Sequence, residues 1–208
     1  MYKITSQMID FPSNAHSTPG FLAQPEGLGQ FPGIVVIQEW WGLVPHIKDV
    51  AERFAREGFI ALAPDLYHGQ AASEPDEARK LAMELDRDAA VAEIVAAMRY
   101  LERLERVAPK KVGVVGWCMG GSLTIATAAA NPGCGAAVAF YGMPRSLEII
   151  SGIQCPVLGL FGEHDHGISL EQIHALDRAL QKNGIAHEVH IYTGAEHKHQ
   201  AQTLTPLK

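Results

Sequence analysis

Short apolar runs that alternate with longer amphipathic segments constrain this chain more than any other feature. Most of the short runs are continuously apolar, which predicts β-strands covered on both faces. The longer segments repeat apolar residues every three or four positions, which predicts helices. We expect strands at 33–38, 59–63, 111–116, 136–141, 156–161 and 187–192, and helices at 46–57, 74–85, 91–104, 119–130 and 170–182.

This order of elements predicts one α/β domain over residues 1–208. Strands separated by helices form right-handed crossover units, and these build a mostly parallel sheet with helices on both faces. In such sheets, ligands bind beyond the carboxyl ends of the strands. Polar residues that directly follow a strand are therefore the candidates for a functional site.

Composition and charge exclude several classes of protein. Hydrophobic residues make up 47% of the 208 residues and the net charge is −6, so the chain is too apolar for a disordered protein and too acidic to coat nucleic acid. We find no signal peptide and no apolar run long enough to cross a membrane, and we expect a cytoplasmic protein with no membrane partner. The three cysteines, Cys118, Cys134 and Cys155, form neither a disulfide framework nor a zinc motif.

The segment 116–121, Gly-Trp-Cys-Met-Gly-Gly, follows a predicted strand and opens a predicted helix. This is the pattern of a nucleophile elbow with Cys118 in the nucleophile position. The glycines suit a sharp turn in which a Cβ atom would strike the neighbouring strand or helix. The helix N-terminus would stabilise a thiolate, and the amide of Met119 could face a developing oxyanion. The alternative is a buried cysteine in a tight turn.

A base and an orienting acid follow the elbow in the order that this kind of site requires. Asp165 follows the strand at 156–161, and His197 lies in the loop after the strand at 187–192. A carboxylate in this position holds the imidazole tautomer, and the imidazole takes the thiol proton. The alternatives are an Asp turn and a solvated histidine.

Glu39 is a fourth candidate, because it follows the first predicted strand in the loop that supplies a second oxyanion amide. Trp40 and Trp41 come directly after it. Between two indole rings a carboxylate is poorly solvated, so it could hold a proton or contact the thiol. The alternative is an exposed loop acid.

At these residues the sequence resembles the dienelactone hydrolase family, a cysteine branch of the α/β-hydrolases. The resemblance runs from about residue 33 to residue 197 in the order of the family, and its motifs lie at 36–39, 63–67, 113–121, 141–142, 165 and 192–197. It implies that Cys118 attacks a lactone or an activated ester, that His197 is the base, and that Asp165 orients His197. It also implies that Glu39 contacts the resting thiol, that the amides of Trp40 and Met119 form the oxyanion hole, and that no metal or organic cofactor is needed.

The resemblance leaves the substrate open. Family members that cleave dienelactone hold the substrate carboxylate with arginines. Here the first matching position falls near Pro75, with Arg79 nearby, and the second is Ala201, four residues past His197. The alternatives are a neutral ester or lactone, or an anion held by Arg79. Tyr67 and Tyr141 are further candidates to line the substrate pocket.

The C-terminal segment departs from the family pattern, in which one more helix packs on the sheet. Residues 198–208 carry no amphipathic pattern, so we expect the final helix to be missing. An apolar stripe on the sheet would then be exposed unless a partner or a second copy covers it. We expect a monomer or a homodimer.

Two rival functions remain. One is a non-catalytic binding or interaction protein with an α/β-hydrolase shell and a truncated C-terminus. The other is a zinc or copper site formed by His164, His166, His197 and His199, which would require that the two His-x-His pairs converge. Of the three cysteines, we expect only Cys118 to be reactive, because neither Cys134 nor Cys155 has a base nearby in the sequence.

Overall fold

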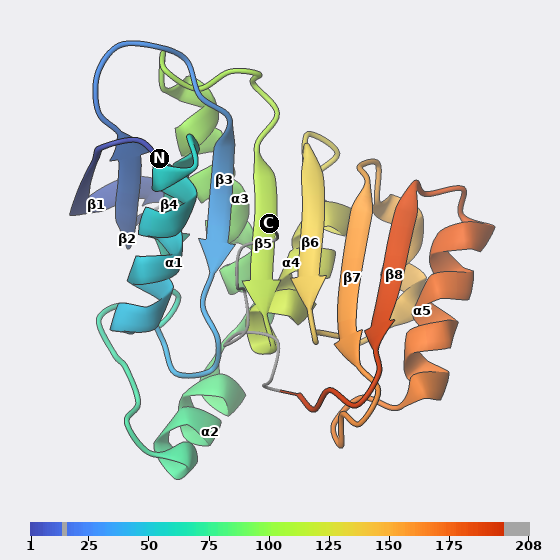
Figure 1. Cartoon of the computed structure of the whole chain (residues 1–208). Coiled ribbons are helices and arrows are strands. Elements are labelled where there is room, and N and C mark those ends of the chain that lie inside the picture. Colours follow the sequence, from blue (N-terminus) through green and yellow to red (C-terminus); the bar gives the residue numbers. More distant parts are fainter. Residues whose placement is uncertain (14–15, 198–208) are drawn as a thin grey trace.

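The computed structural model describes residues 1–13 and 16–197. Eight strands form one sheet in the order β1-β2-β4-β3-β5-β6-β7-β8 (Figure 1). All neighbouring strands in the series β4-β3-β5-β6-β7-β8 pair in parallel. Strands β1 and β2 form an antiparallel hairpin, and β2 pairs antiparallel with β4. The strands are β1 Ile4–Ser13, β2 His16–Pro25, β3 Gly33–Ile37, β4 Ile60–Pro64, β5 Gly113–Trp117, β6 Ala136–Phe140, β7 Val157–Gly162 and β8 His187–Tyr192.

Helices cover both faces of the sheet, as predicted. Helix α1 (Pro45–Arg56) packs on β2 and β4, on the face turned to the viewer in Figure 1. Helices α3 (Arg87–Arg103), α4 (Met119–Ala130) and α5 (Leu170–Lys182) lie behind the sheet, with the 3-10 helix η1 (Leu147–Gly152) against α4 and α5. Helix α2 (Pro75–Glu84) lies beyond the carboxyl ends of the strands, where the fold class predicts a ligand site.

Local sequence signals explain most of these elements. All residues of β3 and β4 are buried, as expected for strands covered on both faces. Ser169 and Gln172 form the reciprocal capping box that begins α5. Helix α3 begins at Arg87, four residues before the predicted start, because the Asp86 side chain accepts hydrogen bonds from the amides of Asp88 and Ala89.

The N-terminal hairpin is a part of the fold that our sequence analysis missed. Strand β1 lies at the sheet edge and is mostly exposed, so its sequence carries almost no apolar alternation. Pro12 and Pro19 lie within the two strands, and proline normally argues against a strand. Pairing with the buried strand β4 decided this segment, and that pairing cannot be inferred from local pattern.

The face that carries α1 has no helix over β6–β8 in the described part of the chain (Figure 1). At the amino ends of these strands there is a groove of about 380 Å³, in which Val138 and Leu158 are half-buried. The expected lack of a final helix concerns residues 198–208 and stays a prediction. The tail from residue 198, including Ala201 and His199, lies outside the described residues.

Candidate active site

Cys118 lies in the sharp turn between β5 and α4. Its backbone has φ 55° and ψ −116°, a left-handed conformation that costs a side-chain-bearing residue about 1–3 kcal/mol. A Cβ atom on Gly116 would lie 2.4 Å from the Gly120 carbonyl oxygen, and one on Gly120 would lie 2.5 Å from that of Gln38. The glycines of the motif therefore let β3, β5 and α4 approach closely enough to hold Cys118 at the carboxyl edge of the sheet.

His197 joins Cys118 to Asp165, although the three residues come from different loops. Its Nε2 atom lies 3.4 Å from the Cys118 Sγ atom, and its Nδ1 atom lies 2.5 Å from the Asp165 Oδ2 atom. The Asp165 side chain is fully buried, and its Oδ1 atom accepts hydrogen bonds from the amides of Gly167 and Ile168 at 2.7 Å and 3.1 Å. One carboxylate oxygen is thus anchored by the backbone, and the other faces the imidazole.

Glu39 is connected to this group through Tyr141. The Tyr141 hydroxyl donates a hydrogen bond to Glu39 Oε1 at 3.3 Å, and its ring centroid lies 4.8 Å from that of His197. Burial, together with the negative charges of Glu39 and Cys118, raises the pKa of Tyr141 above its usual range. Tyr141 therefore stays protonated at neutral pH and can donate its hydrogen bond.

Tyr67 connects the two backbone segments that we expect to form an oxyanion hole. Its hydroxyl donates a hydrogen bond to the Trp40 carbonyl at 3.2 Å and lies 3.5 Å from the Met119 Sδ atom. Burial raises the pKa of Tyr67 to about 12. The side chain thus acts as a neutral hydrogen-bond donor between these segments.

Arg87 is a cation near Cys118 that our sequence analysis missed. Its Nη2 atom donates a hydrogen bond to the Ser122 hydroxyl at 2.7 Å, one helical turn after Cys118. Burial and the charge of Arg145 lower the pKa of Arg87, whereas Tyr67 and Cys118 raise it. Arg87 is also the first residue of α3, where the helix dipole disfavours a cation.

Arg79, which the sequence analysis gave as one alternative for holding a substrate anion, is exposed on α2. Within the described residues, no hydrogen bond or ion pair joins Arg79 to the group around Cys118. The signal that could have identified Arg87 is its position at a helix N-terminus. A basic residue there is unfavourable because of the helix dipole, which indicates that it interacts with groups outside its own helix.

Comparison with known proteins decides the family. The model of the dienelactone hydrolase family matches residues 18–204. The chain belongs to this family. Among its relatives, "Protein usf" of Aquifex pyrophilus is 36% identical, and a protein of Aquifex aeolicus named "Putative carboxymethylenebutenolidase" is 33% identical. Both alignments cover 92% of this chain and 85% of the relative.

Solved structures agree with the family assignment. A crystal structure of a "Putative Dienelactone Hydrolase" from Klebsiella pneumoniae superposes on this chain with a TM-score of 0.87 at 28% sequence identity. The superposition covers 96% of this chain and 89% of the Klebsiella chain. The protein is thus a hydrolase with the dienelactone hydrolase form of the α/β-hydrolase fold. No helix in the described part of the chain is long and apolar enough to cross a membrane.

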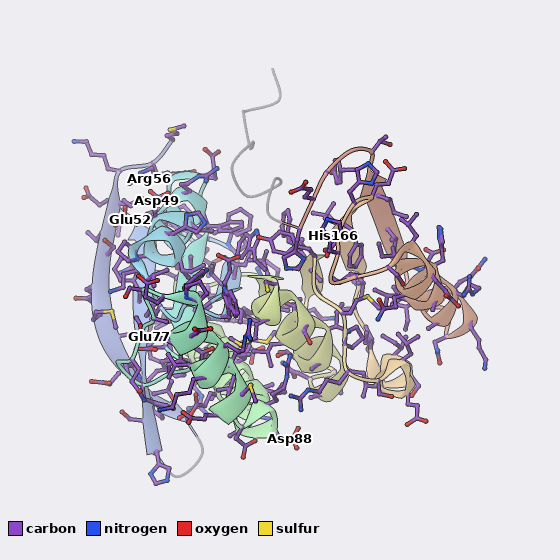
Figure 2. All side chains as sticks on the ribbon, turned by 90° about the horizontal axis from the view of Figure 1, so that it is seen from below. Asp49, Glu52, Arg56, Glu77, Asp88 and His166 are labelled. Atoms are coloured by element: carbon purple, nitrogen blue, oxygen red, sulfur yellow. The ribbon has the colours of Figure 1, made fainter. Side chains whose placement is uncertain are left out.

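The rival metal site finds no support in the described residues. No group of three or more His, Cys, Asp or Glu side chains within 1–13 and 16–197 is placed to hold a metal ion. His197 contacts Cys118 and Asp165 instead. His166 lies in the loop after β7, across the carboxyl edge from Glu77 on α2 (Figure 2). His199, the fourth predicted ligand, lies outside the described residues.

Proposed function

We propose that this hydrolase cleaves a lactone or an activated carboxylic ester through a Cys118–His197–Asp165 triad and a thioester intermediate. The observation that carries the proposal is the continuous chain of contacts from the Cys118 sulfur through both ring nitrogens of His197 to the buried Asp165 carboxylate. A nucleophile, a base and a group that orients the base are the minimal set for covalent acyl transfer.

In the first half-reaction, His197 Nε2 takes the Cys118 thiol proton while the sulfur attacks the carbonyl carbon. The carbon–oxygen bond to the leaving alcohol then breaks, and the imidazolium returns the proton to that oxygen. Asp165 stabilises the imidazolium through Nδ1. In the second half-reaction, His197 takes a proton from water, and the resulting hydroxide attacks the thioester carbonyl carbon. The carbon–sulfur bond then breaks and releases the acid, and the imidazolium returns its proton to the Cys118 sulfur.

The amides of Trp40 and Met119 are the proposed oxyanion donors, and Tyr67 holds their two segments together. One donor of this kind typically contributes 10²–10³-fold in rate. Glu39 is proposed to contact the resting thiol and to help deprotonate it when substrate moves it. The hydrogen bond from Tyr141 keeps this carboxylate in place.

Arg87 favours a substrate with a negative charge near the scissile carbonyl. Its guanidinium is half-buried, and its charge interacts with those of Cys118 and Arg145. Two neighbouring cations such as Arg87 and Arg145 repel one another unless an anion lies between them. A substrate carboxylate bound there would relieve this repulsion. We therefore propose that Arg87, rather than Arg79, holds such an anion.

Stopped-flow hydrolysis of p-nitrophenyl acetate tests the proposal. We expect a burst of nitrophenol stoichiometric with enzyme, and an acetyl group on Cys118 that accumulates in the His197→Gln variant and is detected by mass spectrometry. The Cys118→Ala variant should show neither. Acetylation of another residue, or wild-type turnover no faster than that of Cys118→Ala, would favour the non-catalytic binding protein.

A further inference from the structure

The remaining cysteines, Cys134 and Cys155, lie near one another at the amino ends of β6 and β7, whereas Cys118 lies at the carboxyl edge of the sheet. Cys134 ends the connection from α4 to β6, and Cys155 precedes β7. Strands β6 and β7 pair in parallel with Ala137 opposite Val157, and the Ala137 amide donates to the Pro156 carbonyl at 2.9 Å. Continuing this register towards the amino ends places Cys155 beside Gly135, the neighbour of Cys134. Each thiol shifts the pKa of the other, in agreement with this proximity.

The surroundings of the two sulfurs make them chemically different. Both residues are buried, with 2% and 4% of their surface exposed. Cys134 Sγ also lies 3.5 Å from the Ala136 carbonyl, to which it can donate. The neighbouring Cys134 thiol and the charge of Lys111 lower the pKa of Cys155, whereas the neighbouring Cys155 and burial raise the pKa of Cys134. One sulfur is thus suited to form the thiolate and the other to hold the proton.

We propose that Cys134 and Cys155 are a redox site that hydrogen peroxide converts to an intramolecular disulfide, separate from the reaction at Cys118. Adjacent parallel strands lie about 4.8 Å apart and rise about 3.3 Å per residue, so Cys134, one residue from the position opposite Cys155, is expected at about 6 Å, within the Cα separation that a disulfide can span. The register of β6 and β7 thus brings the two cysteines near one another, and both are buried in the same part of the fold. A small oxidant suits this site because both sulfurs are shielded from solvent.

The chemistry balances in two steps. The Cys155 thiolate attacks one peroxide oxygen, the oxygen–oxygen bond breaks, and protonation gives Cys155 sulfenic acid and one water. Cys134 then loses its proton as its sulfur attacks the Cys155 sulfur, and the hydroxyl leaves as a second water. Two thiols are oxidised by two electrons, and one hydrogen peroxide is reduced to two waters.

The bond would close a loop of about 20 residues that includes β6, Tyr141, Arg145 and η1. Tyr141 and Arg145 lie in the middle of this segment and belong to the surroundings of Cys118, whereas the two thiols lie at its ends. A cross-link of this size should raise Tm by about 5–10 °C in a domain of this length, because it restricts the unfolded chain. The pair would therefore stabilise the fold under oxidising conditions.

The test uses the full chain with Cys118→Ser, so that only the two buried thiols remain. After treatment with hydrogen peroxide, we expect the intact mass to fall by about 2 Da. Peptide mapping should find residues 134 and 155 linked, and Tm should rise by about 5–10 °C and return after reduction with dithiothreitol. Because both thiols are buried, peroxide could reach them only slowly in the folded protein. The reduced chain is therefore also unfolded and refolded in the presence of peroxide, and this treatment should give the same disulfide.

The matched controls add Cys134→Ser, Cys134→Ala or Cys155→Ser to the same background, and none should show the mass loss or the reversible rise in Tm. The alanine variant keeps the control informative if a buried serine hydroxyl impairs folding. A mass that rises in steps of 16 Da, or two thiols that remain alkylatable after both peroxide treatments, would overturn the proposal.

Discussion

The His197 Nδ1 atom lies 2.5 Å from the Asp165 Oδ2 atom, and the Asp165 side chain is completely shielded from solvent. This relationship holds the imidazole with its other nitrogen towards Cys118. It also explains why the carboxylate tolerates burial: backbone amides satisfy its second oxygen.

Asp165→Asn should lower kcat for ester hydrolysis by about 10²–10⁴-fold, because an amide does not stabilise the imidazolium and can hold the wrong tautomer. The amide oxygen can still accept from Gly167 and Ile168, so Tm should change by only a few degrees. Asp177→Asn, which replaces an acid paired with His187 far along α5, is the control and should keep full activity. Equal kcat for wild type and Asp165→Asn would contradict the triad.

Arg87→Met should lower kcat/KM for an aryl ester with a carboxylate in its acyl chain by about 10–100-fold, because one charged hydrogen bond contributes about 1.5–3 kcal/mol. Hydrolysis of the neutral ester of the same length should change by less than about threefold. Arg79→Met tests the arginine suggested by the sequence and should affect neither substrate. A larger loss from Arg79→Met than from Arg87→Met would reverse the assignment.

Gly120→Ala should lower Tm markedly or prevent folding, because the new Cβ atom would lie 2.5 Å from the Gln38 carbonyl oxygen and 2.8 Å from that of Ile37. Alanine normally stabilises a helix by about 1 kcal/mol relative to glycine, so the clash reverses the usual sign. Gly113→Ala in β5 is the control, since its nearest neighbour would be 3.7 Å away. Thermal unfolding of both variants is the measurement, and similar Tm values would show that β3 and α4 do not pack this closely.

The raised pKa of Tyr67 predicts a pH dependence of stability. Since folding raises this pKa from 10.0 to about 12, the stabilisation from the neutral phenol is complete below pH 10 and is lost as pH rises towards 12. Wild type should therefore unfold at a higher temperature than Tyr67→Phe at pH 9, and the difference should shrink by pH 11.5. Tyr192→Phe, at an exposed position, controls for general alkaline unfolding. A gap that stays constant over this range would contradict the prediction.

The sequence was most informative where the signal is local. Strand β3 is continuously apolar, the glycines around Cys118 mark a tight turn, and the capping box at Ser169 marks the beginning of α5. The positions of Asp165 and His197 after two strands were also visible, because carboxyl ends of parallel strands meet at one edge. The hairpin β1–β2 was missed because an exposed edge strand needs no apolar alternation.

The sequence by itself determined the class of sheet, the turn that carries Cys118 and the order of Cys118, Asp165 and His197 along the chain. These depend on periodicity, on glycine geometry and on chain direction, all of which are local properties. Only the tertiary structure decided that Arg87 rather than Arg79 lies near Cys118, that Tyr67 joins the segments of Trp40 and Met119, and that Cys134 lies near Cys155. These pairs are distant in the sequence, and their contacts depend on helix rotation and strand register, which local pattern does not encode.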